Sequence, residues 1–289
     1  MLAVLFALAA AAGYGGSDYT AGLAARRASV VRVTVLAEVT AVALLLCVVP
    51  FISSQAPSPA SVLWGTGAGA SGVAGAMALY LGFRHADFSV ASSVSAVGSA
   101  AFSVLAGIAL GEQPGALALA GIALALPAIV AVSAPAGRPA PGTSPPGKHR
   151  HAAGVGLGLA AGAGFGLFFI GLNQAGSGTD LWPVVVSQVA AMVTVAGLAA
   201  ATRDLGLPPA GARRLSVLTG AIGAAGTVLF FLATHHGLLA ITAVITSLYP
   251  AGTILLARLV SGERLTALRI IGLCLAGASV GLIAVSGAG

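Results

Sequence analysis

Two carboxylates fall inside long apolar stretches, where an ionised side chain is expensive. Glu38 lies about ten residues into the segment 29–51, roughly 15 Å along a helix and near the middle of a bilayer. An acidic residue at that depth costs about 2.5 to 3.5 kcal/mol on insertion scales. We therefore expect Glu38 to face a bundle interior or a wet cavity, where it can contact substrate or carry a proton. A neutral, hydrogen-bonded carboxyl that only holds helices together is the alternative.

Asp18 follows the motif Gly-Tyr-Gly-Gly-Ser near one end of the first apolar segment. The glycines are expected to loosen the helix and to expose backbone groups to a cavity, which would make Asp18 part of a binding site. The rival interpretation is an interfacial Asp18 that pairs with Arg26 or Arg27.

Hydroxyl and aromatic side chains could line a cavity for an organic solute. Taken alone, the hydroxyls are packing contacts between helices, worth around 0.6 kcal/mol each. For any one aromatic residue, lipid-facing packing or interfacial anchoring is favoured over a cavity wall. The hydroxyl candidates are Ser92, Ser95, Ser99, Ser103, Thr246, Ser247, Tyr249 and Thr253, and the aromatic candidates are Tyr14, Tyr80, Tyr249, Phe165, Phe168, Phe169, Phe230 and Phe231.

Metal, cofactor and enzyme chemistry are not indicated. The pair His235 and His236 has no Cys, Asp or Glu at ligand spacing, and neither do the two histidines of the segment 135–152. The glycine runs lack the Gly-Lys-Ser/Thr of a phosphate loop, and no Asp-rich motif could hold Mg²⁺. Cys47 and Cys274 are expected to be buried free thiols. We predict no catalytic residue and no cofactor.

These residues must be positioned by membrane helices. Only 7% of the 289 residues are charged, 58% are hydrophobic, and the mean hydropathy is +1.02, whereas soluble domains carry roughly 25% charged residues. Segments of roughly 20 apolar residues can each span a bilayer. Ten are expected: 2–24, 29–51, 61–82, 86–110, 115–134, 153–173, 181–201, 215–234, 237–260 and 267–286.

The proline-rich, basic segment 135–152 predicts an extended linker between two units, 1–134 and 153–289. A gapless shift of 151 positions aligns the two units at glycines, at a histidine and at a Gly-Glu pair. Five spans per unit would make the second unit enter from the opposite face, as an inverted repeat. The aligned pairs include Gly13 with Gly164, Gly15 with Gly166, Gly69, Gly72 and Gly75 with Gly220, Gly223 and Gly226, His85 with His236, Glu112 with Glu263, and Gly121 with Gly272.

Two stretches carry a family resemblance: SVASSVSAVGSAAFSVLAGIALGEQPGALALAGIAL and AITAVITSLYPAGTILLARLVSGERLTALRIIGLCLAG. Both resemble the signature of the drug/metabolite transporter superfamily, EamA type, in which the fourth helix of each five-helix repeat ends at a Gly-Glu-Arg-like turn. The first stretch departs from the pattern at two positions: Ser99 stands where the second has Pro250, and Gln113 where it has Arg264.

The resemblance implies an all-α, polytopic carrier of ten helices that moves small organic metabolites, commonly outward. It also implies that hydroxyls of the fourth and ninth helices line the central cavity, among them Ser95, Ser99, Thr246 and Tyr249. Glu112 and Glu263 mark the fold: at a short turn, each can lie near the positive end of the next helix. Direct participation in transport is the alternative for these two glutamates.

The net charge of +6 reflects membrane topology rather than nucleic-acid binding, because the basic residues are scattered near segment ends. All 13 fall in the odd-numbered connections, which predicts that these connections are cytoplasmic and both termini outside. The family resemblance implies the reverse orientation.

We thus predict a multi-pass cell-membrane carrier that exports a small molecule, driven by a proton, another ion or the solute's own gradient. A scaffold that transports nothing and a lipid-modifying enzyme are the competing classes.

Overall fold

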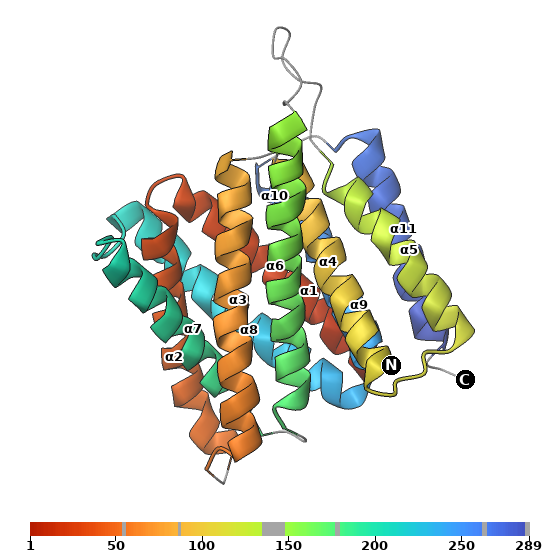
Figure 1. Ribbon diagram of the computed structural model, residues 1–289, viewed down its shortest axis with the longest axis horizontal. Helices are drawn as coiled ribbons and strands as arrows, with labels where there is room; N and C mark the ends of the chain where they lie inside the picture. The colour runs from red at the N-terminus through yellow and green to blue at the C-terminus, as the bar shows by residue number, and fades with distance from the viewer. Residues whose placement is uncertain (54–55, 86–87, 135–147, 177–179, 262–264, 287–289) are drawn as a thin grey trace, which may run out of the picture.

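The computed structural model describes residues 1–53, 56–85, 88–134, 148–176, 180–261 and 265–286, and these form α-helices with no strand. Helices that follow one another along the chain run in opposite directions, with α9 and α10 taken as one span, and together they form one bundle (Figure 1). Their bounds are α1 (Leu2–Ala25), α2 (Val30–Ile52), α3 (Pro59–His85), α4 (Phe88–Ala109), α5 (Ala116–Val132), α6 (Lys148–Gln174), α7 (Trp182–Ala201), α8 (Ala210–His236), α9 (Leu239–Thr246), α10 (Tyr249–Ser261) and α11 (Ala267–Ser286).

Eight helical segments are long and apolar enough to cross a membrane, with α9 and α10 together forming one of them, Leu239–Val260. The apolar helix α5 is shorter. The polar side chains that α1 carries between Tyr14 and Thr20 lower its hydropathy, and α1 is not among the eight. The chain is therefore an all-helical, multi-pass membrane protein.

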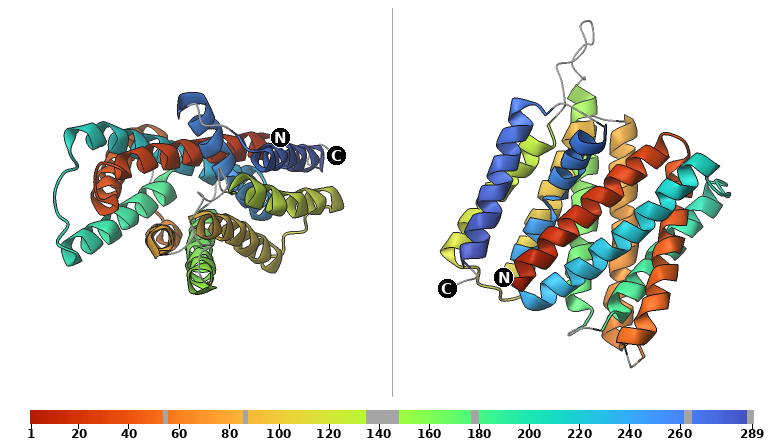
Figure 2. Two further views of the ribbon diagram at one scale, coloured as in Figure 1. Left: turned by 90° about the horizontal axis from the view of Figure 1, so that it is seen from above. Right: turned by 180° about the vertical axis from the view of Figure 1, so that it is seen from behind.

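Long helices pair across the two halves of the chain. These pairs include α1 with α8, α3 and α4 with α6, α2 and α3 with α7, and α5 with α11. Seen from behind, α1 and α8 lie side by side on one face, whereas α3 and α6 lie on the opposite face (Figures 1 and 2). The pair α5 and α11 stands at one edge of the bundle (Figure 2).

The glycines of α1 bring helices together and do not break the helix. Contrary to expectation, α1 is continuous through Gly13, Gly15 and Gly16. A Cβ atom at Gly13 would lie 3.0 Å from the Cα of Gly226, and one at Gly15 would lie 2.7 Å from the carbonyl oxygen of Tyr249. Real Cβ contacts are longer, so only glycine allows α8 and α10 to approach α1 so closely.

The helix break occurs instead in the ninth predicted span, at Ser247 and Leu248. Pro250 explains it: proline has no backbone N–H to donate to the carbonyl of Thr246, and its ring clashes with that carbonyl. A short turn therefore separates α9 from α10, and the chain resumes as a helix at Tyr249.

The cysteine prediction was confirmed for the free thiols and wrong for their burial. Cys47 and Cys274 are free, but both are exposed on the surface of the bundle. They lie within the apolar helices α2 and α11, so they face lipid rather than a protein core.

The helix ends that border the odd-numbered connections lie at one end of the bundle, whereas the start of α1 and the end of α11 lie at the other (Figure 1). Basic residues concentrate on the cytoplasmic side of membrane proteins, so we expect the end that holds the start of α8 to be cytoplasmic.

A cysteine placed at exposed Ala210, in a variant that lacks Cys47 and Cys274, tests this orientation. We expect it to resist a membrane-impermeant thiol reagent in intact cells and to react after permeabilisation. Ready labelling of intact cells would reverse the orientation.

Glycine packing gives a second testable expectation. Gly15→Ala should sharply lower the thermal stability and yield of the purified protein, because the new Cβ would meet the backbone of Tyr249 and Thr253 at 2.7 and 2.8 Å. Gly277→Ala is the matched control, since Gly277 also lies inside a helix but a Cβ there meets nothing within 4 Å. Equal melting temperatures for the two variants would show that this approach does not stabilise the fold.

Candidate functional site

Polar side chains of α1, α2, α7 and α8 form the first candidate site. The hydroxyl of Tyr14 donates to Oγ1 of Thr227 at 3.2 Å, and Nε2 of Gln188 donates to Oε2 of Glu38 at 3.2 Å. Tyr14 also lies within electrostatic reach of Glu38. Glu38 thus faces an amide on the neighbouring helix α7.

The partners Gln188 and Thr227 were missed by sequence reasoning. Gln188 is buried in the apolar helix α7. An amide side chain in an otherwise apolar segment was the signal in the sequence that could have marked it as a site residue. Thr227 looks like an ordinary small residue of α8, and nothing in the sequence shows that it faces Tyr14.

Asp18 lies one turn beyond Tyr14 on α1, but it is exposed. It forms no ion pair with Arg26 or Arg27, so that interpretation was wrong as far as the described residues go. The neighbouring hydroxyls turn toward α8: Oγ of Ser17 donates to the carbonyl of Thr219 at 3.1 Å, and Oγ1 of Thr20 lies 2.8 Å from Oγ1 of Thr219. Tyr14, Ser17 and Thr20 thus form a polar strip on the side of α1 that faces α8, and Asp18 lies at the edge of this strip.

An aromatic core borders the first site. Phe230 and Phe231 are fully buried, so the expectation that such rings face lipid was wrong for them. Phe169 packs on Phe230 with ring centroids 4.4 Å apart, and Tyr14 lies 6.4 Å from Phe169. The polar strip thus has an apolar wall that could contact the hydrocarbon part of a solute.

Hydroxyls at the crossing of α4 and the α9–α10 break form the second candidate site. Ser99 and Ser247 approach to 3.2 Å between their Oγ atoms. The hydroxyls of Ser95, Ser103 and Thr246 are fully buried and lack a hydrogen-bond partner within the described chain.

An unpaired buried hydroxyl costs about 1 to 3 kcal/mol, so such groups call for a ligand, water or a second conformation. The remaining candidate, Tyr249, is half-buried at the start of α10.

Glu112 caps a helix, although not the one expected. Its carboxylate oxygens accept from the backbone N–H of Leu239 at 2.5 Å and of Ala240 at 2.9 Å. These N–H groups open α9 of the second half, whereas the sequence suggested the helix that follows Glu112, α5. The aligned Glu263 lies outside the described residues.

An ion pair joins helix ends on the basic side of the bundle. Nε of Arg32 donates to Oδ1 of Asp204 at 2.6 Å, and Ser29, the N-cap residue of α2, donates to the other carboxylate oxygen. The hydrogen bond from Ser29 lowers the pKa of Asp204 most, partial desolvation opposes it, and the hydrogen bond and charge of Arg32 lower the pKa further. Asp204 thereby ties the end of α7 to the start of α2.

This pairing predicts an acid-sensitive contribution to stability. The pKa of Asp204 is lower in the folded chain than its ordinary value of 3.8, so the stabilisation is fully present above that value and is lost as the pH falls through the folded pKa. We expect Asp204→Asn to melt earlier than wild type at pH 7 and the gap to narrow at pH 3. Because the pair is close to solvent, the gap should be small and should shrink in high salt. A gap that is the same at both pH values would contradict the assignment.

Metal ligation finds no support among the described residues, which contain no cluster of three His, Cys, Asp or Glu side chains. Instead, His235 contacts backbone: its Nδ1 lies 2.7 Å from the carbonyl of Phe231 and its Nε2 lies 2.5 Å from that of Gly176. It therefore links the end of α8 to the end of α6.

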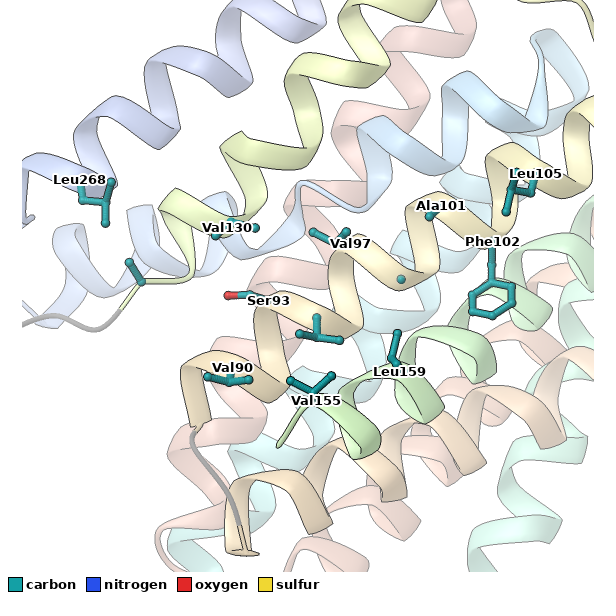
Figure 3. Close-up of a pocket in the computed structure, with 13 residues that line it drawn as sticks. Val90, Ser93, Val97, Ala101, Phe102, Leu105, Val130, Val155, Leu159 and Leu268 are labelled. Atoms are coloured by element: carbon teal, nitrogen blue, oxygen red, sulfur yellow. The ribbon is translucent and has the colours of Figure 1, made fainter. Parts of the chain in front are cut away.

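Two grooves open at the side of the bundle. One, of about 610 Å³, lies between α4, α6 and the α5–α11 pair, and its side chains are almost all apolar (Figure 3). The other, of about 440 Å³, lies between α2, α3 and α7.

Comparison with known proteins identifies the fold but no family. No protein-family model matches the chain, and no curated protein matches it. Among solved structures, 25 chains match. One, described only as "Crystal structure of protein", is similar with a TM-score of 0.75 and 18% identity, over 97% of this chain and 95% of its own length. The helical arrangement therefore recurs in an experimental structure.

Taken together, the two polar sites offer groups that can bind a small molecule. A carboxyl, an amide, a phenol and several hydroxyls can hold a polar or cationic group, and the aromatic core can hold an apolar one. The carboxyl can also exchange a proton.

Proposed function

We propose that this protein is a secondary transporter that exports a small organic metabolite or drug-like compound, with the ten-helix, inverted-repeat architecture of the drug/metabolite transporter superfamily. The observation that carries the proposal is the Glu38–Gln188 pair. It puts a carboxyl within the membrane-spanning part of the bundle, against another polar side chain. Polar groups at such a depth are characteristic of substrate and ion pathways.

Reciprocal contacts support the repeat. Gly13 approaches Gly226, and Gly164 approaches Gly75 in the same way. Gly164 lies 151 positions after Gly13, and Gly226 lies 151 positions after Gly75.

The same holds at the edge of the bundle. Gly121 packs on Ile283, and Gly272 packs on Val132, again with partners 151 positions apart. Matching contacts at matching positions are what two copies of one unit would make around a twofold axis.

A broken helix also favours transport. In secondary transporters, interrupted helices expose backbone and hydroxyl groups to the substrate or the coupling ion. The turn at Ser247 and Leu248 interrupts the ninth span beside Ser99 and the unpaired hydroxyls of Ser95 and Thr246. This site and the Glu38 site are our proposed contacts for solute and coupling ion.

Flux measurements in proteoliposomes test the proposal. Purified protein should move members of a broad panel of metabolites and organic cations, and Glu38→Gln should reduce the flux at least tenfold while leaving the melting temperature within a few degrees. The substitution keeps the size of the side chain and can still pair with Gln188, so loss of flux would reflect the ionisable group.

Asp204→Asn serves as the matched control, because it removes a carboxylate at the end of the bundle and should leave flux nearly unchanged. Wild-type flux in Glu38→Gln at every pH would refute the role of Glu38. No flux of any solute by folded wild type would instead favour a scaffold.

A further inference from the structure

The groove between α4 and the α5–α11 pair has the dimensions of an acyl-chain site. Its α4 wall runs from Val90 to Leu105, which at 1.5 Å per residue is about 22 Å and exceeds half of the roughly 30 Å hydrocarbon core. Figure 3 shows apolar side chains along this wall, including the ring of Phe102, together with the hydroxyl of Ser93. A site with so little hydrogen-bonding capacity suits a hydrocarbon chain.

A cationic group lies at one end of the groove. Nε of Arg269 donates to the carbonyl of Ala134 at 3.0 Å, and Ala134 and the neighbouring Leu268 both line the groove. That bond uses one of the five N–H donors of the guanidinium, so the others remain for a ligand. The ion pair among the described residues joins Arg32 to Asp204, so no described carboxylate neutralises Arg269.

Helix α6 begins at Lys148 and then contributes Val155 to the groove. The groove is therefore apolar along its length, with the guanidinium of Arg269 at its end.

We propose that this groove binds an anionic phospholipid, with one acyl chain along α4 and the headgroup phosphate at Arg269. Arginine matches a phosphate geometrically through paired N–H donors. Basic pockets at the cytoplasmic ends of membrane helices attract anionic headgroups, and this end is the one that the charge distribution assigns to the cytoplasm. The lipid would fill the space between α4 and α5, and so join the α5–α11 pair to the rest of the bundle.

Native mass spectrometry of the full chain tests this proposal independently of transport. Protein is equilibrated in micelles that contain equal amounts of phosphatidylglycerol and phosphatidylcholine with identical acyl chains. Wild type should retain more phosphatidylglycerol than phosphatidylcholine. Arg269→Gln should weaken phosphatidylglycerol binding about fivefold and leave phosphatidylcholine binding unchanged. Fivefold in affinity corresponds to the roughly 1 kcal/mol that one basic residue contributes near an anionic lipid surface.

Two further variants separate the headgroup from the chain. Arg214→Gln removes the same charge from an exposed position on α8 at the same end of the bundle, and should leave both lipids bound as in wild type. Ala101→Trp places an indole in the groove and should displace both lipids. Arg269→Gln removes no buried apolar group, so its result stands even if Ala101→Trp lowers the yield.

The proposal fails if Arg269→Gln and Arg214→Gln weaken phosphatidylglycerol binding equally, which would indicate general surface attraction. It also fails if Ala101→Trp retains both lipids. If the wild type instead forms dimers without bound lipid and Ala101→Trp is monomeric, a second copy of the chain fills the groove and the proposal also fails.

Discussion

Backbone contact at glycine is the interaction on which the rest of this structure depends. In a bilayer, lipid tails are as apolar as leucine, so helices gain little from hiding apolar side chains against each other and must gain from close packing. Here α1 meets α8 at Gly13 and Gly226, and α3 meets α6 at Gly75 and Gly164, with almost no space for a Cβ atom between them. The distance between these helices fixes where their side chains meet.

The polar sites follow from that packing. With α1 held close to α8, the hydroxyl of Tyr14 reaches Thr227, and Ser17 reaches the backbone of Thr219. Each such bond removes a polar group from contact with hydrocarbon, where an unpaired one costs several kcal/mol. The bundle thus tolerates a polar strip because glycines bring its members within hydrogen-bonding distance.

The sequence predicted what depends on composition and periodicity. Hydropathy and charge located the helical segments, and the depth of Glu38 indicated a protein-facing carboxyl. The contacts that depend on how one helix is rotated about its axis against another could not be predicted from the sequence. The partner of Glu38, the helix capped by Glu112 and the lipid-facing thiols of Cys47 and Cys274 are each set by which face of a helix meets its neighbour. In a helix that is apolar all round, the sequence carries almost no signal for that rotation.

The two halves of the chain differ at a position where one residue changes the backbone. At the aligned positions, α4 carries Ser99 and remains continuous, whereas the second half carries Pro250 and breaks into α9 and α10. Serine keeps its backbone N–H and can return its hydroxyl to a carbonyl of its own helix, as Ser99 does to Ala96. Proline can do neither, and the second half breaks beside Thr246, whose hydroxyl has no hydrogen-bond partner among the described residues. Because a continuous helix and a broken one respond differently to bending, any motion of this bundle is expected to concentrate at the turn between α9 and α10 rather than in α4.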